Sequence, residues 1–134
     1  MSQLYDHTFD LLEKTLDLRM KRHAVLSTNV ANSDTPKFRA IDFDFNGELE
    51  RAMKQGASDL GVTNPRHLNL ESNSDSRIIY DYSMPMGADG NNVDPDMALG
   101  KLAQNTQAFN NAAEYMFIKI RLLRFAARGG QGGM

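Results

Sequence analysis

The chain has 134 residues, enough for one domain, and its 15 Lys and Arg against 17 Asp and Glu give a formal net charge of -2. This balance gives no electrostatic basis for binding nucleic acid or an anionic membrane. The chain has no cysteine, which excludes disulfides, thiol nucleophiles and zinc–thiolate sites, and no apolar run approaches the roughly 20 residues of a membrane span.

The first predicted element is a long amphipathic helix over residues 3–31. Its apolar side chains share one broad arc, and acidic and basic side chains occupy the other side. The apolar positions that recur every seven residues are Leu4, Leu11, Leu18 and Val25. A face this wide needs a packing partner. The start of the segment is acidic and lacks a continuous apolar region, so we expect no cleavable secretory signal.

The second predicted region, residues 32–94, is irregular because prolines and glycines interrupt it. Its first part alternates apolar and polar residues with a period near two, as a half-buried strand does. The elements that we expect here are a strand over 38–45, a short helix over 46–55, extended pieces at 67–71 and 77–82, and a mobile loop over 83–92.

The third predicted element is a helix over residues 95–128. Asp94 is a favourable N-cap and Pro95 suits the first helical position, while glycines at 129 and 130 end the helix and begin a flexible tail over 129–134. Apolar residues spaced alternately by three and four predict a seam of the coiled-coil type. The seam residues of this helix are Leu99, Leu102, Phe109, Ala113, Met116, Ile120 and Leu123.

These elements predict a mainly α fold. Its long N- and C-terminal helices pair as a coiled-coil-like core, and the short middle segment is irregular and contains β-structure. We expect residues 1–31 and 95–128 to form a helical assembly core, with residues 32–94 outside it. The pattern leaves open whether the seam residues contact the other helix of the same chain or helices of other chains.

The residue patterns predict no catalytic, cofactor or metal site and no small-molecule substrate. The three histidines are scattered, and no glycine-rich phosphate loop or nucleophile elbow is present. The stretch "DGNNVD", residues 89–94, fails as a calcium loop and is better interpreted as an Asp-Gly turn that leads into a helix cap. For Arg121, Arg124 and Arg128 the sequence favours a helix-dipole or subunit-contact role over nucleic-acid binding.

The stretch "NVANSDTPKFRAIDFDF", residues 29–45, resembles the signature of bacterial flagellar rod, hook and hook-filament axial proteins. Their pattern is Ala-Asn-x-x-Thr-Pro-Gly-Tyr after a heptad-like helix. The matching residues are Ala31, Asn32, Thr35 and Pro36, with Phe38 in place of the usual tyrosine. Lys37 stands where glycine is usual, although lysine adopts a positive φ only at a cost. "GNNVD" before the last helix is also similar to this group.

The resemblance fits the flagellar basal-body rod family, and its B-type proximal rod subunits best. It implies a structural, non-enzymatic subunit of the drive shaft that transmits torque from the membrane ring to the hook. It implies rod subunits, the rod/membrane-ring junction protein, the membrane ring and the type III export apparatus as partners, and a periplasmic location in the basal body. The alternatives are a C-type proximal rod subunit and a cytoplasmic coiled-coil adaptor or export chaperone.

The resemblance also gives the motif residues a proposed role. We expect Asn32 to Pro36 to stop the first helix, with Pro36 restricting Thr35 to extended geometry. The chain would then be redirected at a fixed angle into the segment that follows.

Overall fold

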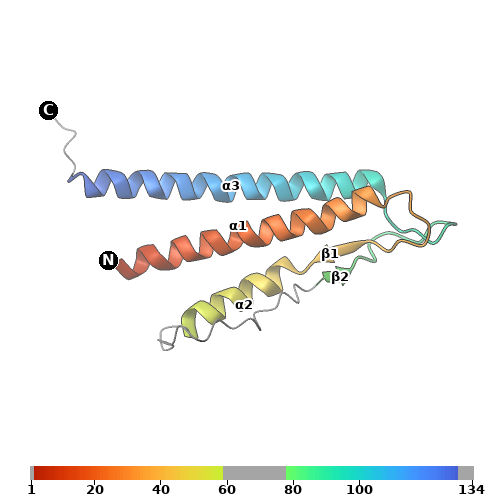
Figure 1. Cartoon of the computed structure of the whole chain (residues 1–134), viewed down its shortest axis with the longest axis horizontal. Helices are drawn as coiled ribbons and strands as arrows, with labels where there is room; N and C mark the ends of the chain where they lie inside the picture. The colour runs from red at the N-terminus through yellow and green to blue at the C-terminus, as the bar shows by residue number, and fades with distance from the viewer. Residues whose placement is uncertain (1, 59–77, 130–134) are drawn as a thin grey trace.

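The computed structural model describes residues 2–58 and 78–129. Its elements in chain order are α1 (Ser2–Ala31), β1 (Ile41–Phe43), α2 (Phe45–Ser58), β2 (Ile78–Tyr80) and α3 (Pro95–Ala127). Helices α1 and α3 lie side by side and antiparallel, and α2 lies on the other side of α1 (Figure 1). The predicted mainly α architecture with long terminal helices is confirmed.

The ends of α3 follow from local chemistry. The carboxylate of Asp94 accepts hydrogen bonds from the backbone N–H groups of Asp96 and Met97 at 2.9 and 3.0 Å, so the predicted N-cap is present. At the other end Gly129 adopts a φ of +65°, and its N–H donates to the carbonyl of Ala126. This left-handed geometry is the one that glycine adopts readily after a helix.

The middle of the chain holds less strand than the sequence predicts. β1 spans three residues and pairs antiparallel with β2, with Asp42 opposite Ile79. The predicted strand over 38–45 is therefore too long, because Phe45 already belongs to α2. Asp44 ends the extended segment, since its side chain accepts a 3.1 Å hydrogen bond from the N–H of Gly47 and caps α2. The extended piece expected at 67–71 lies outside the described residues.

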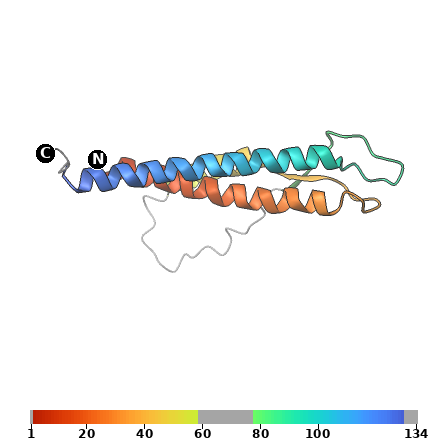
Figure 2. The same ribbon diagram turned by 90° about the horizontal axis from the view of Figure 1, so that it is seen from above.

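A small apolar core fixes α1 against the middle segment. Leu18 of α1 is buried together with Phe43 and Phe45, and Val25 and Leu49 pack against this cluster. Helix α1 therefore has two partners, α3 along one side and the β1–α2 segment along another. The start of α1 and the end of α3 lie at one end of the α1–α3 pair, and the loops that follow α1 and precede α3 lie together at the other end (Figures 1 and 2).

Candidate assembly interface

The loops at the end of the pair where α1 ends and α3 begins form a compact unit, which we call the junction and define as residues 32–40 and 81–94. Asn91 lies at its centre and is buried. Its side-chain amide nitrogen donates to the carbonyl oxygens of Asn32, Ser33 and Thr35 at 3.0, 2.9 and 2.9 Å. Its amide oxygen accepts from the N–H of Val93 at 2.7 Å. One side chain thus binds three carbonyls of the turn that follows α1.

Two further buried asparagines, Asn29 and Asn92, bind backbone groups of the segment that leads into β1. Asn29 holds both backbone groups of Ile41, donating to its carbonyl at 2.6 Å and accepting from its N–H at 2.9 Å. Asn92 accepts from the N–H of Ala40 at 2.6 Å and donates to the carbonyl of Asp81 at 2.8 Å. These bonds tie α1, the start of β1 and the loop before α3 into one polar network.

The structure brings the five family-motif residues together in the junction turn. Ala31 is the last residue of α1, and Asn32 accepts from the hydroxyl and the N–H of Thr35 at 3.1 and 3.0 Å. The N–H of Phe38 donates to the carbonyl of Thr35 at 3.3 Å, and the Phe38 side chain is half-buried, whereas Pro36 is exposed. The motif therefore builds the local turn, and Asn91 anchors it from the distant loop.

Lys37 adopts the conformation that the usual glycine would take at this position. Its φ is +64°, in the left-handed region, and its N–H donates to the carbonyl of Asp89 at 2.9 Å. Gly90 lies against it, since a Cβ built on Gly90 would come within 3.5 Å of the Lys37 Cα. The hydrogen bond to Asp89 holds Lys37 in a geometry that is unfavourable for a residue with a side chain.

A salt bridge attaches the junction to the first turns of α3. The Lys101 ammonium donates to the carboxylate of Asp81, which also accepts from the N–H of Ser83 at 2.9 Å. Burial acts to raise the pKa of Asp81, but the bonds from Lys101 and Ser83 outweigh it and hold this pKa below its usual value.

The predicted seam residues of α3 differ in exposure. On α3, Leu102, Phe109 and Met116 are half-buried, whereas Leu99 is exposed by 51%. The other half-buried seam residues of this helix are Ala113, Ile120 and Leu123. The buried row of α3, namely Ala98, Asn105 and Ala112, was missed, because it consists of small or polar residues.

On α1, the predicted seam residues do not all face α3. Leu18 and Val25 pack against the phenylalanines of β1 and α2 instead. Leu11 is half-buried, and the side chain of Leu4 lies outside the described part of the structure. The seven-residue spacing therefore identified the face of α1 that contacts the middle segment.

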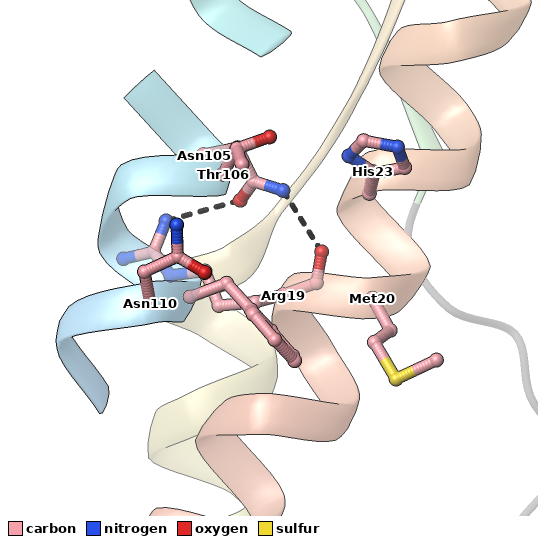
Figure 3. A pocket seen from close by; sticks show the side chains of 7 residues that line it. Arg19, Met20, His23, Asn105, Thr106 and Asn110 are labelled. Carbon is pink, nitrogen blue, oxygen red and sulfur yellow. Dashed lines mark hydrogen bonds between the residues drawn. The ribbon is translucent and has the colours of Figure 1, made fainter. Parts of the chain in front are cut away.

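Halfway along the α1–α3 pair, a buried polar contact interrupts the apolar packing (Figure 3). Asn105 donates to the carbonyl of Arg19 at 2.9 Å and accepts from its guanidinium at 3.4 Å. The guanidinium carbon lies 3.8 Å from the centre of the Phe45 ring. The pKa of Arg19 is lowered, mainly by burial and to a smaller extent by the charge of Arg22.

An open groove of about 350 Å³ lies beside this contact. Its lining residues are Arg19, Met20, His23, Asn105, Thr106, Phe109 and Asn110.

The C-terminal half of α3 carries an apolar stripe that α1 does not cover. Its members are exposed by 42–66% and are spaced by three, four and three residues: Tyr115, Ile118, Leu122 and Phe125. We call them the outer stripe. The sequence contained this signal, because the same three-four spacing defines it. A four-residue apolar row left in water is typical of a surface that another helix covers.

The described residues contain neither a candidate metal cluster nor a membrane-spanning helix. Within residues 2–58 and 78–129 there is no group of three or more His, Cys, Asp and Glu that could hold a metal ion. In the same part of the chain, no helix combines the length and the apolar character needed to span a membrane. The arrangement is one of helices with uncovered faces and a rigid junction, which suits protein–protein contact.

Comparison with known proteins gives relatives that match over most of the chain. No family model matches the chain. A protein of Aeromonas hydrophila is 34% identical over 132 residues, covering 98% of this chain and 100% of the relative. One from Proteus mirabilis strain HI4320 is 32% identical, covering 95% and 96%, and one from Escherichia coli K12 is 33% identical, covering 70% and 73%. All three are named flagellar basal body rod protein FlgB.

Proposed function

Because this chain belongs to the FlgB family of flagellar basal body rod proteins, we propose that its terminal helices form an assembly core through which copies and related subunits join. The chain is a structural subunit of the flagellar basal body rod, and so serves motility. The relatives are structural rod proteins, which implies a role without catalysis. They give no support to a C-type subunit, a coiled-coil adaptor or an export chaperone.

The specific partners are part of the proposal. The chain assembles with other rod components, and among these we expect the neighbouring proximal rod subunits and the rod/membrane-ring junction protein. It reaches its place through the flagellar export apparatus without cleavage and stands in the periplasmic part of the shaft, near the membrane ring. The resemblance of residues 29–45 to the axial-protein signature supports this assignment.

The observation that carries the assembly role is the uncovered outer stripe of α3. A subunit that worked alone would have no reason to keep Tyr115, Leu122 and Phe125 more than half exposed along one helix. In a rod, head-to-tail contacts that do not close into a ring generate a continuous filament, and each added subunit covers such a face on the one before.

The test is genetic and biochemical. The gene is deleted in the source bacterium and replaced by a copy with a C-terminal tag, and purified basal bodies are probed for the tag. We expect the deletion strain to lose motility and its basal bodies to lack rods, and the tagged chain to restore both and to be present in the basal-body fraction with its full-length mass. A deletion strain that still swims, or a tagged chain confined to the cytoplasm, would contradict the assignment.

A further inference from the structure

We propose that the C-terminal half of α3 docks on the outer face of α1 of a second copy of this chain, displaced along the helix axis by about two heptads. This inference rests on the proposed function and deepens it by naming the two faces and their register. Three independent observations carry it: an overhang of α3, a match of exposed charges, and the position of the outer stripe.

The first observation is that α3 extends past the end of α1. The contact between Asn105 and Arg19 fixes the register of the antiparallel pair. Counting outward from it by equal steps brings Ser2, where α1 begins, level with Leu122. The last residues of α3, up to Ala127, therefore have no α1 beside them (Figure 1). A helix segment that overhangs its own partner is available to a neighbour that is displaced along the axis.

The second observation is a match of exposed charges between the two helices. An acidic row, Asp10, Glu13 and Asp17, lies on the outer face of α1. A basic row, Arg121, Arg124 and Arg128, lies on the exposed side of α3. All six side chains are exposed, and none of them forms an ion pair within the described part of the chain.

The spacing of the two charge rows sets the register. When the helices run antiparallel, Asp17 level with Arg121 brings Glu13 within one position of Arg124, and Asp10 level with Arg128. Within one chain, Asp17 lies level with Gln107, given the Asn105–Arg19 contact. The match therefore requires a second copy shifted by about 14 residues, or roughly 21 Å at the helical rise.

The third observation is that the same shift places apolar groups together. The outer stripe runs beside the basic row on α3, so the two can meet one partner helix. On α1, the row of Asp10, Glu13 and Asp17 continues at the same spacing to Met20, which is exposed by 61%. In the shifted register Met20 lies level with Ile118 of the stripe. Charges at the edge then fix register and orientation, while the stripe provides the apolar area.

A contact of this kind is head-to-tail. It uses α3 of one copy and α1 of the next, with the same axial shift at each step, so it generates an open filament instead of a closed dimer. The contact also keeps all copies pointing in the same direction, because α1 and α3 are already antiparallel within the chain.

Cysteine cross-linking tests the register directly, because the chain has no cysteine of its own. Two copies with different tags, one carrying Asp17→Cys and the other Arg121→Cys, are co-expressed in the deletion strain. Isolated basal bodies are treated with a bis-maleimide that spans the about 8–10 Å between packed helices. We expect a product that carries both tags. The matched control replaces Thr28, exposed on the same face of α1 but outside the proposed contact, and should give at least tenfold less product.

A charge-reversal series tests the pairing itself. Arg121 is one of the three arginines to be replaced by glutamate, so it cannot also carry the cysteine. The cysteine pair in this series is therefore Ile118→Cys in one copy and Met20→Cys in the other. We expect reversal of the basic row alone to lower the cross-link yield at least tenfold. Reversal of the acidic row to lysine in the partner copy should restore it. Restoration also shows that the reversed chains fold.

The outcomes separate the contact from the proposed function. Two results would overturn the inference while the chain remained a rod subunit. One is a cross-linked product from the Thr28 control pair in place of the Asp17 pair. The other is a set of products in which each tagged copy is joined only to a different protein. If the chain is absent from basal bodies, the proposed function fails, and a purified mixture of the two tagged copies then decides the contact. The same cross-link in that mixture supports the contact, and its absence overturns it.

Discussion

At the scale of single residues, the junction depends on side-chain amides that hydrogen-bond to backbone groups. Asn29, Asn91 and Asn92 are each buried, and each bonds backbone groups of a different segment. An amide side chain carries both a donor and an acceptor, so it can pair with carbonyls and N–H groups at once. Segments that are far apart in the sequence thereby acquire the hydrogen bonds that a regular sheet or helix would otherwise supply.

Asn91 gives the sharpest residue-scale prediction. In Asn91→Asp, a carboxylate replaces the amide nitrogen that donates to three carbonyl oxygens, so the donors are lost and negative charge faces the carbonyl dipoles. We expect the free energy of unfolding to fall by about 3 kcal/mol. Urea titration followed by circular dichroism measures it. Asn110→Asp, an exposed site on α3, is the control and should change stability by less than about 0.5 kcal/mol.

Lys37 gives a prediction of opposite sign. Because its φ is +64°, replacing it by glycine removes the steric cost of a left-handed side-chain residue, and we expect a gain of about 1 kcal/mol in the free energy of unfolding. Lys37→Ala removes the same charge but keeps the Cβ, so it should give no such gain. Equal stability of the glycine and alanine variants would show that the backbone geometry carries no cost here.

The Asp81–Lys101 salt bridge predicts a pH dependence. The folded state holds the pKa of Asp81 below its usual value, so its contribution to stability is present above the unfolded pKa of about 4 and is lost as the pH falls through the folded value. Asp81→Asn should therefore be less stable than the parent chain at pH 7, with a difference that shrinks on acidification. In a Lys101→Gln background the pH dependence of that difference should weaken, and an unchanged profile there would point to another cause.

At the scale of elements, α1 and α3 approach each other through small residues. The buried row of α3 consists of Ala98, Asn105 and Ala112, spaced by seven, and larger apolar side chains lie at its flanks. Alanine at the closest positions lets two helix backbones come near each other. The single asparagine in the row bonds Arg19 of α1, and so fixes the register of the pair.

Ala112 is the position at which this close approach can be tested. We expect Ala112→Leu to lower the free energy of unfolding by about 1–3 kcal/mol, because the added methyl groups enter a packed contact between helices. Ala103→Leu adds the same groups on an exposed side of α3 and serves as the control. If both variants unfolded at the same urea concentration as the parent chain, the packing of Ala112 would not be limiting.

The elements differ in whether they could be predicted from the sequence. The two long helices and the Asp94 cap could be predicted because heptad spacing and capping chemistry are local signals. The end of the first strand was missed although its signal is also local: Asp44 caps α2 by accepting from the N–H of Gly47 three residues later, whereas the alternation over residues 38–45 favoured a longer strand. The asparagine network could not be predicted. Asn29 and Asn105 sit inside helical patterns, and nothing local shows that their partners are Ile41 and Arg19.

At the scale of the whole molecule, the two ends of the α1–α3 pair differ in how firmly they are held. The junction end contains the buried asparagines, the Asp81–Lys101 salt bridge and the capped start of α3. Toward the termini, the C-terminal half of α3 carries the exposed outer stripe and then overhangs α1. This asymmetry suits a rod subunit, because the junction end can keep its shape while the exposed C-terminal half of α3 stays available to a neighbouring subunit.

The asymmetry predicts a gradient of local stability along α3. In hydrogen exchange of the purified monomer, we expect amides near Ala98 to Asn105 to exchange most slowly and those beyond Ala113 to exchange at least tenfold faster, because few buried contacts hold the second half of the helix. Assembly into the rod should slow exchange in the second half specifically, since the outer stripe is then covered. Uniform protection along α3 in the monomer would mean that the open end is already stable alone, and that covering it contributes little to assembly.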